Sequence, residues 1–154
     1  METAATHLLQ NYRQQPIVLD RGLGAQVWDI EGKKYLDLLG GIATCALGHC
    51  HPEVVAAVKA QVDKLWHTSN VFYTVPQIEL AKKLTAASGL DRAFFCNSGA
   101  EANEALFKLA RRVQKDRGNP ERFEIICFEN SFHGRTLATV AATGQPKYHK
   151  GFEP

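Results

Sequence analysis

The sequence predicts an α/β fold with two parts, a small N-terminal hairpin subdomain and the start of a larger parallel-sheet domain. The first supporting observation is a pair of alternating runs flanking Glu31-Gly32-Lys33, which is typical of a β-hairpin. The second is an apolar run, a helical pattern and another apolar run over residues 92–128. This β-α-β order implies parallel neighbouring strands with a right-handed crossover. The third is composition, because 45% hydrophobic and 22% charged residues are typical of a soluble globular protein.

Charge and targeting signals exclude several classes of protein. The net charge of +2, from 18 basic and 16 acidic residues, gives no electrostatic argument for binding nucleic acid or an anionic membrane. No apolar run approaches the roughly 20 residues that span a bilayer, and no secretory signal opens the chain. The four cysteines show no CxxC spacing, and Cys96 and Cys127 are expected to be small buried side chains. These features favour a reducing, cytoplasmic compartment.

The N-terminal region is predicted to contain short, local elements. Residues 4–13 favour a short helix or a mobile arm that ends before Pro16, and residues 17–19 favour a short strand. We expect residues 1–70 to form the N-terminal segment and part of the small domain. Residues 71–154 would then begin the large domain.

The hairpin itself is predicted from two runs of alternating side chains, residues 25–30 and 34–38. Asp29 and Asp37 are expected on its wetter face, because one face of an antiparallel sheet commonly meets water. A hairpin of this kind is typical of a small subdomain rather than of a parallel sheet.

The middle of the chain is predicted to be helical between polar loops. Residues 39–51 form a glycine- and histidine-containing loop, and helical periodicity then runs from residue 52 to about residue 66. A polar and aromatic loop over residues 67–74 leads into a second helix over residues 76–87. Gly89 is expected to end that helix.

The turn after the first apolar run is the strongest candidate for a binding site. Residues 93–96 favour a strand, and Ser98 and Glu101 form an S-x-x-E capping box that starts a helix near Gly99. The first turn of such a helix presents unpaired N–H groups and the positive end of the helix dipole, which suit a phosphate. Taken alone, however, the S-x-x-E pattern favours an ordinary capped helix, because capping boxes are common.

A second loop is expected to meet this turn. Residues 123–128 favour another strand, residues 129–136 a loop, and residues 137–143 a short helix. Because ligands of open α/β sheets bind beyond the carboxyl ends of the strands, both loops would face one crevice. Two parallel strands and one crossover cannot form a sheet covered on both faces, so we expect the N-terminal piece of a longer protein.

Phe132 and Arg135 give the second loop its chemical character. Phe132 is expected either to pack into a local core or to stack on a planar aromatic cofactor. Arg135 is expected either to be a solvated or helix-capping residue or to hold a carboxylate in its planar fork. A phosphate seat, a ring stacker and a carboxylate fork together match the needs of a pyridoxal phosphate enzyme that acts on amino acids.

Several motifs in order resemble the class III aminotransferases, the ornithine/4-aminobutyrate type of fold-type I pyridoxal phosphate enzymes. They are Asn97-Ser98-Gly99-Ala100-Glu101-Ala102-Asn103-Glu104, Ser131-Phe132-His133-Gly134-Arg135-Thr136, Gly40-Gly41-Ile42-Ala43 and Leu47-Gly48-His49-Cys50-His51-Pro52. The segments most similar to the acetylornithine branch are Leu65-Trp66-His67-Thr68-Ser69-Asn70 and Gly144-Gln145-Pro146-Lys147-Tyr148. The resemblance extends over about residues 11–154.

The resemblance implies a role for each motif residue. The residues that would bind pyridoxal 5'-phosphate are Ser98, Gly99 and Ala100 at the phosphate and Phe132 on the pyridine ring. Arg135 would bind the substrate carboxylate, and His133 would shape the loop. Many acetylornithine enzymes carry Thr where this chain has Ala100, so a hydroxyl is lost but the backbone N–H group is kept.

The resemblance also implies the reaction. It is the transfer of an amino group from N2-acetylornithine, or a related ω-amino acid, to 2-oxoglutarate in two half-reactions, as in arginine biosynthesis. The Schiff-base lysine of the family and the acidic partner of the pyridine nitrogen would follow Pro154. We therefore expect no catalytic residue among these 154 residues, no activity from this chain alone, and a homodimer for the full chain.

Alternatives remain at this stage. His49-Cys50-His51, with Cys45 nearby, has residue types of a metal site, but adjacent residues converge poorly on one ion, so we expect no metal. A loop packed near the cofactor or a dimer contact is preferred. A non-catalytic phosphate-binding module would use the same helix N-terminus without Phe132 or Arg135. Within the family, 4-aminobutyrate, ornithine and succinylornithine also remain open as substrates.

Overall fold

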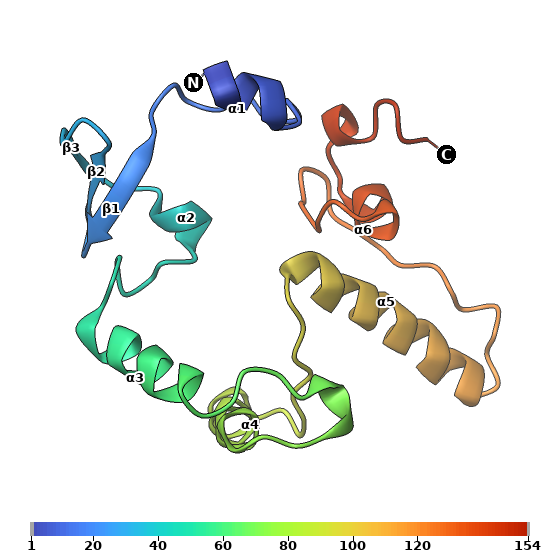
Figure 1. The fold of residues 1–154 in the computed structure, drawn as a ribbon. Helices are drawn as coiled ribbons and strands as arrows, with labels where there is room; N and C mark the ends of the chain where they lie inside the picture. Colours follow the sequence, from blue (N-terminus) through green and yellow to red (C-terminus); the bar gives the residue numbers. More distant parts are fainter. Residues whose placement is uncertain (1, 154) are drawn as a thin grey trace. The chain divides into compact units, whose positions relative to one another are not determined.

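The computed structural model describes residues 2–153, apart from the side chain of the first of them, and is shown in Figure 1. Its contacts divide the chain into two compact units, residues 1–72 and 73–154, which are described separately below. The domain boundary expected between residues 70 and 71 stays a prediction. Within the described residues, no helix combines the length and the apolar character needed to cross a membrane.

The first unit contains a three-stranded antiparallel sheet and several helices. Its elements are α1 (Glu2–His7), β1 (Leu19–Leu23), β2 (Gln26–Asp29), β3 (Lys34–Leu36), α2 (Gly40–Ala43), α3 (Pro52–Val62) and η1 (Ser69–Val71). The sheet order is β1-β2-β3, so the predicted hairpin of β2 and β3 is confirmed. The strand predicted at residues 17–19 begins only at Leu19 and extends to Leu23, where it pairs with β2.

Asp29 lies under the hairpin turn, where it is only 8% exposed, so its prediction on the wetter face is wrong. Its Oδ1 atom accepts the backbone N–H groups of Glu31 and Lys33 at 3.0 and 2.9 Å, and its Oδ2 atom accepts the Tyr35 hydroxyl at 2.7 Å. Three donors replace water around the carboxylate, which is why it can be buried. The hydrogen bond from Tyr35, with those from the turn, holds the pKa of Asp29 below its ordinary value.

The second unit is helical. Its elements are α4 (Val75–Ser88), α5 (Gly99–Asp116), α6 (Leu137–Ala142) and η2 (Pro146–Tyr148). Gly89 ends α4 in the left-handed conformation, as predicted, with φ of 71°. The short helix α6 packs against α5.

The two strands predicted in this unit are not formed. Residues 93–96 and 123–128 lie outside the helices, and neither run pairs as a β-strand within the described residues, so the prediction of a hydrogen-bonded β-α-β unit is wrong for this chain. A parallel sheet is stable when helices cover both of its faces, and these residues do not provide that cover. Side chains of the second run are correspondingly exposed, and Ile126 is 94% exposed.

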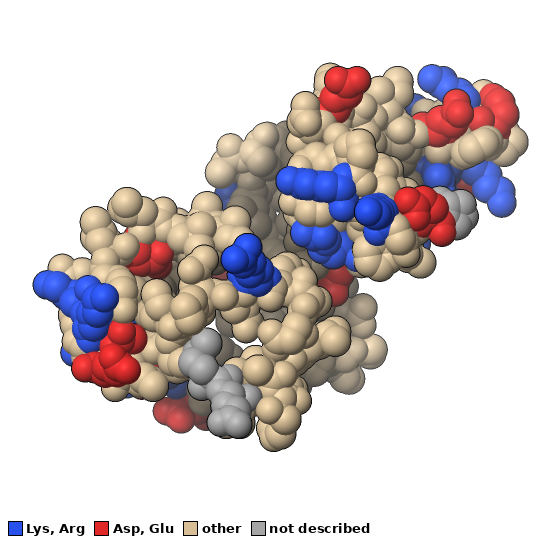
Figure 2. Space-filling view, turned by 90° about the horizontal axis from the view of Figure 1, so that it is seen from above, with Lys and Arg blue, Asp and Glu red and all other residues tan. Residues whose placement is uncertain are grey.

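Cys96 and Cys127 lie within these unpaired runs. Cys96 is exposed and Cys127 is half-buried, so the prediction that both are small buried side chains is wrong. Among the apolar side chains of residues 2–153, only Val27 and Val140 are counted as buried. On the face seen in Figure 2, acidic and basic side chains are interspersed between wide uncharged areas.

Candidate functional site

The N-terminus of α5 is fixed by its cap. Ser98 has extended backbone angles, and its Oγ atom accepts the backbone N–H of Glu101 at 3.2 Å. The Glu101 carboxylate accepts the backbone N–H of Asn97 at 2.7 Å rather than that of Ser98. The cap predicted at Ser98 is therefore present, with its reciprocal bond moved one residue toward the N-terminus.

Two N–H groups at this helix start have no acceptor. Within the described residues, the N–H groups of Gly99 and Ala100 donate to no acceptor, as expected for the first turn of a helix. A β-carbon added at Gly99 would meet no atom within 4 Å. An 18-residue helix thus presents its free N–H groups and its positive dipole end to open space, an arrangement that fits a phosphate group.

The loop of residues 131–136 is bound to the first two turns of α5. The Asn103 side-chain amide donates to the carbonyl of His133 at 2.7 Å, and the Thr136 hydroxyl donates to the Glu104 carboxylate. Gly134 lies so close to Ala100 that a β-carbon at Gly134 would be 2.7 Å from the Ala100 β-carbon. The structure therefore brings the two loops together, as predicted, although the sheet that was expected to align them is absent.

Buried threonines of α6 support this loop from the other side. Thr136 caps α6 in a capping box with Thr139, and the side chains of Thr139 and Thr143 are fully buried. The Thr143 hydroxyl accepts the backbone N–H of His133 at 3.0 Å and donates to the carbonyl of Thr139 at 2.8 Å. Sequence reasoning missed these threonines; their signal was a T-x-x-T-x-x-x-T spacing that begins directly after Arg135.

Phe132 and Arg135 lie with a second aromatic residue, Tyr148. The Phe132 ring is 54% exposed rather than packed in a local core, and it meets Tyr148 edge to face at 5.8 Å between centroids. The Cζ atom of Arg135 lies 4.1 Å from the centroid of Tyr148 and 5.6 Å from that of Phe132. In residues 2–153, no carboxylate is within ion-pair distance of Arg135.

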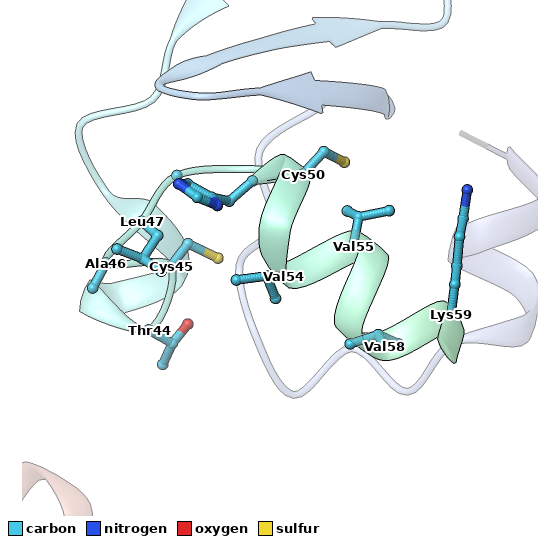
Figure 3. A pocket seen from close by; sticks show the side chains of 11 residues that line it. Thr44, Cys45, Ala46, Leu47, Cys50, Val54, Val55, Val58 and Lys59 are labelled. Carbon is cyan, nitrogen blue, oxygen red and sulfur yellow. The ribbon is translucent and has the colours of Figure 1, made fainter. Parts of the chain in front are cut away.

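The histidine-containing loop of the first unit has a different organisation. Asp37 accepts a hydrogen bond from His49 Nε2 at 2.7 Å, which holds the pKa of this carboxyl below its ordinary value. No cluster of three or more metal-ligating side chains occurs within the described residues. Figure 3 shows a mainly apolar groove of about 710 Å³ between this loop and α3, lined by Cys45, Val54 and Val58 among others. None of the predicted site residues lines it.

Comparisons with known proteins define the class of this chain. Residues 8–154 match the model of the class-III aminotransferases, so the chain belongs to that family. It is 74% identical to the acetylornithine aminotransferase of Myxococcus xanthus over 154 residues, which are 100% of this chain and 38% of that protein. The chain therefore spans a little over a third of the length of this relative.

Solved structures place the fold in the same family. The ornithine aminotransferase of Toxoplasma gondii, crystallised with oxidised glutathione and described with partial occupancy of PLP at its active site, matches 99% of this chain and 36% of its own. The TM-score is 0.91 and the identity is 32%. The N-acetylornithine aminotransferase of Stenotrophomonas maltophilia matches 86% of this chain and 35% of its own, with a TM-score of 0.77 and 45% identity. The predicted fold class, the N-terminal part of a fold-type I transaminase, is confirmed.

Proposed function

We propose that the full-length protein transfers an amino group from N2-acetylornithine to 2-oxoglutarate with pyridoxal 5'-phosphate as its cofactor, as in arginine biosynthesis. The observation that carries this proposal is the meeting of the α5 N-terminus with the loop of Phe132 and Arg135, at the contact between Ala100 and Gly134. The 74% identity to an acetylornithine aminotransferase supports the choice of amino donor.

The phosphate of the cofactor would bind at the start of α5. The unpaired N–H groups of Gly99 and Ala100 would donate to its oxygens, and the absence of a side chain at Gly99 would admit it closely. The Ser98 hydroxyl accepts from Glu101, which leaves its own hydrogen free to donate to the phosphate. When bound, pyridoxal phosphate supplies the electron sink that amino-group transfer requires.

The loop of residues 131–136 would bind the pyridine ring of the cofactor and the carboxylate of the amino donor. The half-exposed Phe132 ring offers a face for the pyridine ring, and Arg135 offers a planar fork to the carboxylate of the amino donor. Hydrogen bonds from Asn103 and to Thr143 fix the backbone of His133 between them, which supports a loop-shaping role for that residue. These contacts would position the cofactor and the amino donor before any bond changes.

The decisive experiment is an assay of the full-length protein with pyridoxal phosphate, 2-oxoglutarate and one amino donor at a time. We expect glutamate to form fastest with N2-acetylornithine. Faster turnover of ornithine, succinylornithine or 4-aminobutyrate would replace the proposed donor and keep the family reaction. A protein that binds phosphate but gains no visible absorbance with pyridoxal phosphate would be a non-catalytic phosphate-binding module, and the proposal would be wrong.

We also infer that the full-length protein is a cytoplasmic homodimer. The membership of the chain in the class-III aminotransferases supports the dimer, which the resemblance of its motifs to fold-type I enzymes implies. The four free cysteines support a reducing compartment. Sedimentation of the full-length protein at the mass of one chain would contradict the dimer.

A further inference from the structure

Tyr148 has no role in the function proposed above, yet its ring is the nearer of the two aromatic rings that contact the Arg135 guanidinium. The Cζ atom of Arg135 is 4.1 Å from the Tyr148 ring centroid, nearer than to that of Phe132 at 5.6 Å. We propose that Tyr148 is a positioning residue for the substrate carboxylate, because its ring holds Arg135 where the carboxylate binds. This inference rests on the proposed function, which assigns that carboxylate to the amino donor.

Stacking on a ring leaves the binding edge of an arginine free. A guanidinium that lies over an aromatic ring is attracted through its flat face, while its N–H groups point outward in the plane. Within residues 2–153, no carboxylate pairs with Arg135 and its side chain donates no hydrogen bond. The ring thus restricts an otherwise mobile exposed side chain without occupying the donors that a carboxylate needs.

The position of Tyr148 is set by the backbone around it. Its N–H group donates to the carbonyl of Gln145 at 3.0 Å, and the Gln145 side chain donates to the carbonyls of Asn130 and Ser131, both at 3.1 Å. Gly144 adds two bonds, from its N–H to the Ser131 hydroxyl and from the Asn130 N–H to its carbonyl. The segment that carries Tyr148 is therefore tied to the start of the loop that carries Arg135.

The Tyr148 hydroxyl takes no part in this arrangement. No hydrogen bond of that hydroxyl is found among the described residues, so the ring alone is expected to matter. The Phe132 ring contacts the Tyr148 ring edge to face. This contact fixes the tilt of the Tyr148 ring relative to the Phe132 ring, on which the cofactor is proposed to stack. Tyr148→Phe therefore keeps the aromatic ring beside Arg135, and Tyr148→Ala removes it.

The test uses the full-length holoenzyme and two amino donors that differ only in the carboxylate, N2-acetyl-L-ornithine and N-acetylputrescine. We expect Tyr148→Ala to lower kcat/KM for N2-acetylornithine by about 5- to 30-fold, mainly through KM, as loss of a cation–π contact predicts. For N-acetylputrescine the change should stay within about 2-fold, measured as turnover or as a competitive inhibition constant. Tyr148→Phe should restore the wild-type preference for the donor with a carboxylate.

The outcomes separate this inference from the proposed function. Equal losses on both donors would assign Tyr148 a general structural role, and a loss in Tyr148→Phe as large as in Tyr148→Ala would assign the effect to the hydroxyl; either result overturns the inference. A wild-type enzyme that uses N2-acetylornithine, with an unchanged donor preference in Tyr148→Ala, overturns the inference alone. A wild-type enzyme inactive with N2-acetylornithine overturns the proposed function and the inference with it.

Discussion

The hairpin of the first unit and the extended runs of the second unit are both strand-like in sequence, but only the hairpin forms a sheet. A short turn joins β2 to β3, and the two strands pair antiparallel. β1, which precedes them in the sequence, pairs antiparallel with β2. Residues 93–96 and 123–128 are separated by an entire helix and remain unpaired. Antiparallel neighbours need only a turn, whereas parallel ones need a crossover and flanking strands. A strand pattern therefore predicts a strand only where a partner is within reach.

The same contrast explains why the candidate site is nevertheless assembled. Its two loops are held by polar contacts between side chains and backbone, from Asn103 to His133 and from His133 to Thr143, and not by a sheet. These contacts join residues 30 and 10 positions apart in the sequence, but each needs only one donor and one acceptor, so they form without the further strands and helices of a large domain. The site geometry thus depends less on sheet pairing than the strand-like runs that lead into it.

The largest expected effect is on the hydrogen-exchange rates of backbone amides, compared between β2 and the two unpaired runs of the second unit. In the 154-residue chain alone, the amides of residues 93–96 and 123–128 should exchange like unprotected peptide. In a full-length protein of the length of the relatives, they should slow by on the order of 10³-fold or more, because they become paired in a sheet. Amides of β2 should change far less between the two. Mass spectrometry of both proteins measures this, and equal protection of the two extended runs would contradict it.

Close packing of the two site loops gives the next effect. Gly134→Ala should destabilise the full-length protein by about 3 kcal/mol, because the new β-carbon would lie 2.7 Å from that of Ala100 at a φ of 139°. Gly118→Ala is the matched control, since its φ is also positive, at 80°, but no atom lies within 4 Å of the added carbon. Chemical denaturation measures both variants. Equal losses would mean that backbone strain, and not the loop contact, causes the effect.

The smallest effect tests the local sheet. Asp29→Asn should lower the free energy of unfolding at pH 7 by about 1–2 kcal/mol, because a neutral amide accepts the Tyr35 and backbone donors less strongly. The folded pKa of Asp29 is below its unfolded value near 3.8, so its contribution is present above that pH and is lost as pH falls below it through the folded pKa. Denaturation curves between pH 7 and pH 2 measure this. The variant should show a shallower acid loss, and identical curves would contradict the assignment.

Short-range signals were the ones that sequence analysis read correctly. The cap at Ser98, the helix stop at Gly89 and the hairpin turn at Glu31-Gly32-Lys33 each depend on a few neighbouring residues. The burial of Asp29 was missed because three donors from the turn and from β3 make it possible, and alternation alone does not record them.

Long-range contacts account for the other misses at the site. Arg135 and Tyr148 are 13 positions apart, and the chain between them contains α6, a loop and the start of η2. No periodicity of the sequence therefore predicts their contact. Gly134 stood within a recognised motif, but its close approach to Ala100 required the two loops to be placed in space. The five predicted site residues, Ser98, Gly99, Ala100, Phe132 and Arg135, lie in one unit, while their roles stay predictions.

The contact between Gly134 and Ala100 also has an evolutionary consequence. Because no β-carbon fits at residue 134 while residue 100 has one, the two positions cannot vary independently. A replacement of Gly134 is tolerated only if the loop moves, because the Thr139 hydroxyl at 2.7 Å and the Ala100 α-carbon at 3.0 Å would also crowd the added β-carbon. Growth at residue 100 is tolerated only in directions away from the loop. Side-chain size at residue 100 can therefore change within that limit, while residue 134 is held as glycine by the atoms around it.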